Sequence, residues 1–166
     1  MEDPDSEETK SFVEAHNTVC QPFFDCDVWK KINEKLTNVW NYPKYSAPAR
    51  HGKQYFFYAN SGLQNQSVLF KQETLTSEPT VFLDPNALST DGTIALSGTA
   101  FSDDGNKFAY GLSENGSDWI KIKIRDVNTG VDFNECLEKV KFSSMSWTKD
   151  NKGIFYSVSI QYIIGK

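Results

Sequence analysis

The hydrophobic positions of the first forty residues recur every three or four residues, which is the spacing of one face of an α-helix. Two such stripes are Phe12, His16, Val19 and Phe23, and then Val28, Ile32, Leu36 and Val39. Asp5, with Glu8 three positions later, has the pattern of a helix-capping box. Pro22 is expected to end or kink the first helix, and Pro43 is expected to stop the second, because the residue before a proline avoids the helical region. Neither helix can bury its stripe alone, so we expect both to pack against a further surface.

From Tyr42 onward the chain changes to short runs of β-forming residues separated by turn signals. The predicted strands are residues 54–58, 67–70, 107–110, 119–124 and 153–156. Within one of them, Ile120, Ile122 and Ile124 alternate with charged residues, which predicts one buried and one solvent-exposed face. This region is therefore predicted to be all-β.

The β region also repeats itself. Residues 101–110 (FSDDGNKFAY) align with residues 147–156 (WTKDNKGIFY), and residues 48–57 form a weaker copy. Each copy has an apolar or proline start, a polar turn and an aromatic strand. A repeat of about 40 to 50 residues with four short strands is typical of a β-propeller blade, and the alternative is three unrelated hairpins in a sandwich. Since propellers close with about four to eight blades, residues 42–166 are predicted to form two to three blades of an incomplete ring.

Composition and charge exclude several classes of function. Hydrophobic residues make up 39% and aromatic residues 14% of the chain, enough for a packed core. A net charge of −5 gives no support for binding phosphates, so nucleic acid is not an expected partner. No run approaches the roughly 18 apolar residues of a membrane helix, and the acidic first residues are unlike a secretion signal. The three cysteines are scattered, so we expect reduced thiols in a cytoplasmic protein, with no disulfide framework and no metal site.

Catalytic and phosphate-binding motifs are absent from the sequence. No Gly-x-Ser-x-Gly string occurs, and residues 111–115 (GLSEN) come nearest to it. His16 lies on a helical stripe, where we expect a packed imidazole, and His51 lies beside a turn glycine, where we expect a solvated loop residue. Residues 103–105 (DDG) are explained by an Asp-Gly turn rather than by a calcium loop. Acyl-transfer chemistry and a bound cofactor are therefore not expected in this chain.

Longer motifs, in order along the chain, resemble the prolyl oligopeptidase family. They include residues 2–6 (EDPDS), 42–46 (YPKYS), 61–66 (SGLQNQ), 81–86 (VFLDPN), 101–105 (FSDDG), 116–119 (GSDW) and 140–143 (VKFS). The resemblance extends from Glu2 to about Tyr156, whereas residues 157–166 depart from the family. It implies a serine endopeptidase that cuts short peptides after proline, with an α/β-hydrolase domain capped by a seven-bladed propeller.

The resemblance also implies how the chain is organised. Residues 1–41 are expected to form the N-terminal helical segment that packs on the catalytic domain, and residues 42–166 the first propeller blades. The expected partners are proline-containing peptides, the rest of the peptidase domain and the remaining blades. The catalytic Ser, Asp and His belong to the later hydrolase portion, so no catalytic residue is carried over and the chain alone is expected to be inactive.

Two substrate-contacting residues are implied by the same resemblance. Phe142, in the motif 140–143, is expected to help form the pocket for the third residue upstream of the cut. Asp118, in the motif 116–119, is expected to face the same cavity, where a carboxylate favours cationic peptides. The structural alternatives are that Phe142 opens a strand as part of a blade core and that Asp118 is a turn residue.

Two functions follow from this sequence: a fragment of a prolyl-specific peptidase, which we favour, or a non-catalytic propeller that binds peptides or a protein. A downstream reading frame with Gly-x-Ser-x-Gly, then Asp and His, would decide for the first, and a verified stop codon after Lys166 for the second. We also expect the isolated chain to self-associate through its uncovered blade face and strand edge. Apolar residues near the end are expected to add to this, namely Ile160, Tyr162, Ile163 and Ile164.

Overall fold

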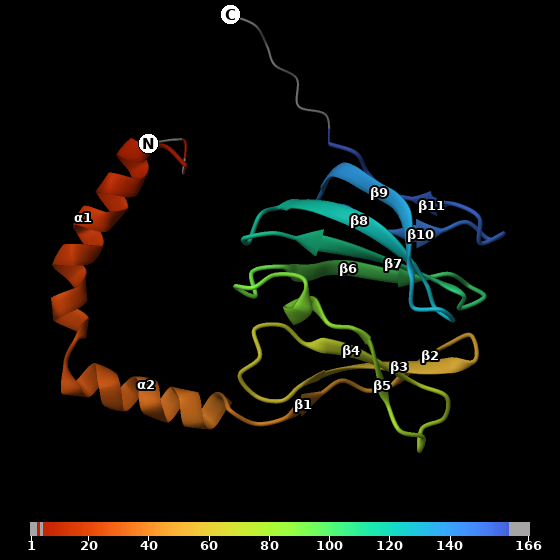
Figure 1. Cartoon of the computed structure of the whole chain (residues 1–166), viewed down its shortest axis with the longest axis horizontal. Helices are drawn as coiled ribbons and strands as arrows, with labels where there is room; N and C mark the ends of the chain where they lie inside the picture. The colour runs from red at the N-terminus through yellow and green to blue at the C-terminus, as the bar shows by residue number, and fades with distance from the viewer. Residues whose placement is uncertain (1–2, 4, 160–166) are drawn as a thin grey trace, which may run out of the picture. The chain divides into compact units, whose positions relative to one another are not determined.

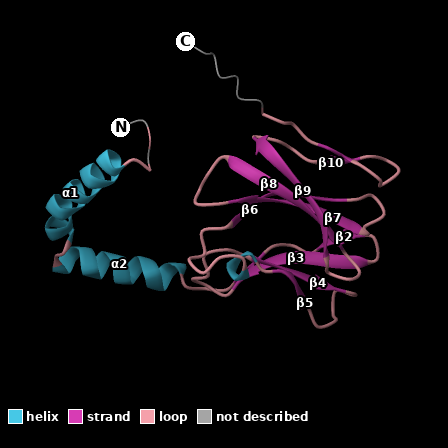
Figure 2. Ribbon diagram, turned by 45° about the horizontal axis from the view of Figure 1, so that its top comes forward, coloured by secondary structure: helices cyan, strands magenta, loops and turns pink. Residues whose placement is uncertain are grey.

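The structure is a computed structural model that describes residues 3 and 5–159. The chain divides into two compact units, Met1–Tyr42 and Pro43–Lys166. Among the described residues, the first unit is helical, and the second consists of strands and loops with one short 3-10 helix, Pro85–Ala87 (Figure 2). The four apolar residues near the end, which are expected to add exposed surface, all lie at position 160 or later. They are therefore outside the described residues.

The first unit contains two helices, α1 (Glu7–Phe24) and α2 (Asp27–Trp40). The cap of α1 was predicted one residue too early: the side chain of Ser6, not Asp5, accepts the hydrogen bond from the Thr9 amide. Pro22 lies inside α1, in its last turn, and the helix ends two residues later at Phe24. No described residue of either helix is buried, so both apolar stripes lie exposed on this unit.

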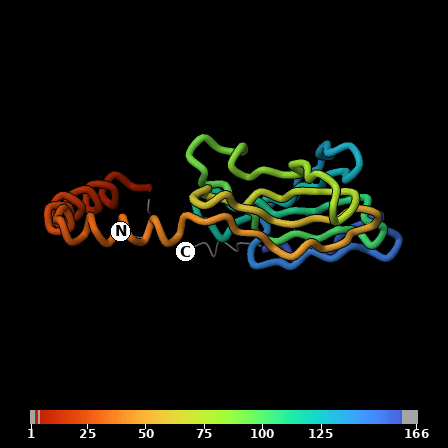
Figure 3. Tube along the Cα trace, turned by 90° about the horizontal axis from the view of Figure 1, so that it is seen from below, coloured from red at the N-terminus to blue at the C-terminus, as the bar shows by residue number. Residues whose placement is uncertain are grey.

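Up to residue 159, where the description ends, the second unit contains three antiparallel sheets that follow one another along the chain and lie stacked in that order (Figure 1). The first sheet consists of β1 (Lys44–Tyr45), β2 (Ala49–His51), β3 (Gln54–Asn60), β4 (Val68–Gln72) and β5 (Thr80–Leu83). The second consists of β6 (Ala95–Phe101), β7 (Lys107–Ser113), β8 (Trp119–Asp126) and β9 (Asp132–Lys141). The third contains β10 (Ser146–Trp147) and β11 (Ile154–Phe155). In the first sheet both β1 and β2 pair with β3; from β3 to β5, and within the other two sheets, the chain runs back and forth between neighbouring antiparallel strands, as the tube view traces (Figure 3).

The internal repeat is visible in the hydrogen bonds of two turns. In the β6–β7 turn, the hydroxyl of Ser102 donates to Asp104 and accepts from the Lys107 amide. In the β10–β11 turn, the hydroxyl of Thr148 donates to Asp150 and accepts from the amide of Gly153. The same contacts at equivalent positions identify the two hairpins as copies of one unit, as the sequence predicts.

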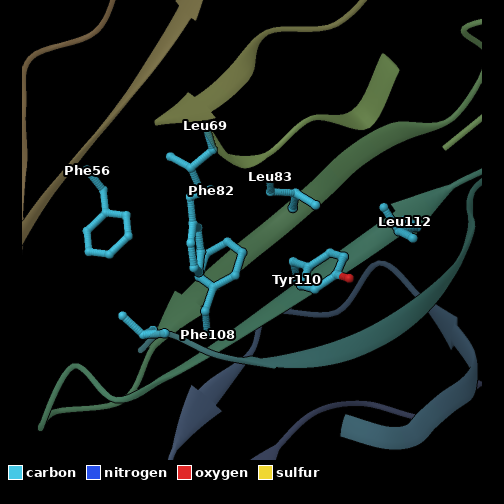
Figure 4. Packing of buried hydrophobic residues seen from close by; sticks show 8 residues of the cluster. Phe56, Leu69, Phe82, Leu83, Phe108, Tyr110 and Leu112 are labelled. Carbon is cyan, nitrogen blue, oxygen red and sulfur yellow. The ribbon is translucent and has the colours of Figure 1, made fainter. Parts of the chain in front are cut away.

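Two hydrophobic clusters fill the spaces between the sheets. Phe108, Tyr110 and Leu112 of β7 face the first sheet, where they pack with Phe56 and Phe82 (Figure 4). The opposite face of the second sheet contributes Ala109, Ile120, Ile122 and Val140, which pack with Trp147 and Ile154 of the third sheet. The strand β7 of the second sheet is therefore buried on both faces, whereas most residues of the outer strand β9 are exposed.

Candidate functional site

The two substrate-contacting residues expected from the sequence are brought together by a lysine. Asp118 precedes β8 and Phe142 follows β9, and these two strands are hydrogen-bonded neighbours. Lys141 Nζ lies 3.2 Å from Asp118 Oδ2 and 5.0 Å from the centre of the Phe142 ring. The same ammonium lies 5.6 Å from the centre of the Trp119 ring. We call Asp118, Trp119, Lys141 and Phe142 the aromatic patch.

Phe142 does not open a strand, as the structural alternative supposed, but follows the last residue of β9. Its backbone has φ of 52°, in the left-handed region that non-glycine residues rarely adopt. Lys139, three residues earlier, has φ of 59°. Val140 between them is completely buried, whereas the side chain of Phe142 is 81% exposed. Phe142 is therefore a surface residue on a conformationally restricted backbone, not part of a blade core.

Trp119 and Lys141 are members of the patch that the sequence reasoning did not identify. They are register partners across β8 and β9, so their side chains lie on the same face at the same level of the sheet. Each is adjacent in sequence to a predicted site residue, and this adjacency was the available signal. Their pairing depends on the register of two strands, with irregularities between Ile120 and Ile122, and it required the tertiary structure.

A second polar cluster joins the first and second sheets. Arg125 Nε donates to Asp132 Oδ1 over 2.7 Å and Nη2 donates to Oδ2 over 3.2 Å, while the Tyr110 hydroxyl donates to Oδ2 over 2.8 Å. Arg125 Nη1 also donates to the carbonyl oxygen of Phe82 in β5. Burial opposes ionisation of Asp132, but the hydrogen bonds from Arg125 and Tyr110 outweigh it and lower its pKa. Burial and the hydrogen bond to Asp132 raise the pKa of Tyr110. This cluster has a structural role between sheets.

Comparison with known proteins identifies the fold. A family model described as "Prolyl oligopeptidase, N-terminal beta-propeller domain" matches residues 1–161. The chain belongs to the prolyl oligopeptidase family. A prolyl endopeptidase of Elizabethkingia miricola is 42% identical over 158 residues, which cover 95% of this chain and 22% of that protein.

Solved structures agree with this assignment. Prolyl oligopeptidase B from Galerina marginata, bound to a 25mer macrocyclization substrate, matches with a TM-score of 0.80 and 30% identity. That match covers 92% of this chain and 24% of the other. A structure from a study of two prolyl endopeptidases matches the fold with a TM-score of 0.87 over 99% of this chain and 24% of that one, at 23% identity. The chain spans about a quarter of the length of these relatives. Together, the matched propeller domain, the two helices and this partial coverage confirm the prediction of a partial propeller preceded by two helices.

The histidines of this prolyl oligopeptidase segment have structural contacts. His16 is exposed rather than packed in a core; its ring lies against Phe12, with Nδ1 2.8 Å from the Phe12 carbonyl oxygen. His51 is half-buried in β2 rather than solvated, because its ring stacks on Phe101 at 3.9 Å, and burial lowers its pKa. Within the part of the chain that the structure describes, no three His, Cys, Asp or Glu side chains gather as a metal site. Among those residues no helix is long and apolar enough to cross a membrane.

Proposed function

We propose that this chain is the N-terminal part of a serine endopeptidase that hydrolyses short peptides after proline. The observation that carries the proposal is the family match over residues 1–161, together with 42% identity to a prolyl endopeptidase over 158 residues. A macrocyclization substrate bound to the Galerina marginata relative supports a peptide as the substrate. The active site belongs to the part of the peptidase that this chain does not include, and the propeller lines the substrate cavity.

In this proposal residues 1–41 pack on the catalytic domain and residues 42–166 form the first blades. The exposed stripe of α2, with Val28, Ile32 and Leu36, supports the first assignment, because an amphipathic helix needs an apolar surface to cover it. We further place the protein in the cytoplasm. The three exposed cysteines, all free, are typical of a reducing compartment.

Within the cavity, Phe142 forms an aromatic wall for the side chain of the third residue upstream of the cut, and Asp118 faces the same space. The exposure of the Phe142 ring and its restricted backbone support this role, since residues in rare backbone conformations cluster at functional sites. A rigid aromatic ring offers apolar contact area at a small entropic cost.

The test replaces Phe142 by alanine in a complete peptidase that carries this segment. We expect kcat/KM for a peptide with a large apolar residue at the third upstream position to fall by about 1–3 kcal/mol in transition-state terms, relative to a glycine peptide. Phe133→Ala, at the opposite end of β9, is the matched control and should leave the ratio of kcat/KM for the two peptides unchanged. Equal losses for both peptides together with a lower melting temperature would assign Phe142 a purely structural role.

A further inference from the structure

The charge in the aromatic patch is balanced from within. Asp118 supplies one negative charge and Lys141 one positive charge, and the two groups form an ion pair of 3.2 Å. A charged peptide side chain that approaches the patch therefore meets a paired dipole and not a free carboxylate. Asp118 alone would favour cationic peptides, and its pairing removes that preference.

The position of the Lys141 ammonium is set by aromatic rings as well as by the carboxylate. It lies near the faces of Trp119 and Phe142, with 5.6 Å and 5.0 Å to the ring centres. Both distances fall within the range of cation–π attraction. Because the Lys141 ammonium lies over the Phe142 ring, it also favours one orientation of the ring that, in the proposed function, contacts the substrate.

The backbone around Lys141 makes this arrangement a fixed feature of the fold. Val140 is buried in the core between the second and third sheets, and left-handed residues stand on either side of the Val140–Lys141 pair. The buried valine anchors the end of β9, and the cross-strand register places Lys141 opposite Trp119. The lysine stem therefore starts from a defined point.

We propose that Lys141 sets the charge preference of the patch, an inference that rests on the proposed function of Phe142. By neutralising Asp118 it makes the patch select neutral apolar side chains at the third residue upstream of the cut. Without the positive charge of Lys141, the Asp118 carboxylate and the rings of Trp119 and Phe142 form an aromatic-walled anionic site, and such a site binds cations. Lys141 is a positioning and specificity-determining residue and takes no part in the chemical step.

The experiment measures kcat/KM for two proline peptides that differ only in the third upstream residue, phenylalanine or lysine. In the complete peptidase carrying this segment, we expect the wild type to have the higher kcat/KM for the phenylalanine peptide. In Lys141→Met, which keeps the length and the apolar stem of the side chain, we expect the lysine-to-phenylalanine ratio to rise about three- to tenfold. The rise should diminish at high salt, since exposed charges are screened.

Three further variants isolate the cause. Asp118→Asn combined with Lys141→Met should return the ratio to the wild-type value, and Lys141→Arg should keep it there. Lys149→Met is the matched control, because Lys149 also pairs with an aspartate, Asp103, on the surface, and its loss should leave the ratio unchanged.

Failure of this inference can be told apart from failure of the proposed function. If Phe142→Ala weakens the phenylalanine peptide but Lys141→Met leaves the ratio unchanged, the role of Lys141 is refuted and the function of Phe142 stands. If Phe142→Ala affects neither peptide, both fail. Where Lys141→Met lowers the melting temperature, Lys141→Gln serves as the second neutral variant, and an unchanged ratio in it also refutes the inference.

Discussion

Replacing Asp132 by alanine tests how much the polar cluster of Arg125, Asp132 and Tyr110 stabilises the second sheet where it meets the first. The substitution removes the acceptor of three hydrogen bonds, two from Arg125 and one from the Tyr110 hydroxyl. The Arg125 side chain is only 14% exposed and that of Asp132 28%. The guanidinium keeps its bond to the Phe82 carbonyl and its position near the Phe82 and Tyr110 rings, but its charge loses its partner.

The expected magnitude lies between two measured limits. Breaking a buried ion pair costs about 3–5 kcal/mol, because the remaining charge is left uncompensated. An exposed pair contributes about 0–1 kcal/mol. Since one partner is nearly buried and the other partly exposed, and since the hydrogen bond from the Tyr110 hydroxyl to the carboxylate is lost as well, we expect Asp132→Ala to lower the free energy of unfolding by about 2–3 kcal/mol. For a chain of this size that corresponds to a fall in melting temperature of about 4–12 °C.

The assay is urea unfolding of the chain followed by far-ultraviolet circular dichroism, at two protein concentrations to separate folding from association. Asp103→Ala is the matched control: it removes an aspartate from an exposed pair, in which the Lys149 side chain is 93% exposed, and should cost less than about 0.5 kcal/mol. The double variant Arg125→Met with Asp132→Ala should be at least as stable as Asp132→Ala alone, since it leaves no unpaired charge. The reasoning is refuted if Asp132→Ala costs no more than Asp103→Ala.

Three further predictions concern other features of the second unit. Gly116→Ala should lower the free energy of unfolding by about 1 kcal/mol, and Gly105→Ala should lower it by clearly more. Both glycines have left-handed backbones, but only at position 105 would the new Cβ collide with the backbone of the facing turn, 2.4 Å away. Equal losses in urea unfolding would contradict this. Because the pKa of Tyr110 is raised in the folded state, the contribution of its hydroxyl to stability is complete below about pH 10 and is lost as the pH rises further. The wild type should therefore lose more unfolding free energy than Tyr110→Phe between about pH 8 and pH 11. Parallel losses would show the prediction to be wrong. Phe155→Lys, on the edge strand β11, should shift the chain from oligomers toward monomer in size-exclusion chromatography, whereas Val131→Lys, in an exposed turn, should not; a wild-type chain that elutes as a monomer would refute the expected self-association.

Local periodicity in the sequence was sufficient to predict the classes of structure and the hairpin repeat. The three- to four-residue spacing up to Trp40 defines two helices, and the alternation from Trp119 predicts β8, because side-chain direction along a helix or strand depends only on local geometry. The predicted strands correspond to β3, β4, β7, β8 and β11, whereas the other strands were missed. The longest of these, β9, was missed since its ten residues include many exposed polar side chains and few apolar ones. An outer strand is stabilised by pairing with its neighbour, a long-range contact that leaves little trace in its own composition.

The sequence by itself also determined the family, through motifs spread along nearly the whole chain, and that resemblance led to the proposal that Phe142 and Asp118 contact the substrate. Only the tertiary structure decided that Lys141 joins these two residues and that Trp119 belongs with them. Strand register places Trp119 opposite Lys141 although 21 intervening residues separate them in the sequence. A charge that looks free in the sequence is therefore paired in the fold, because the partner of a side chain depends on which strands meet and not on which residues are adjacent.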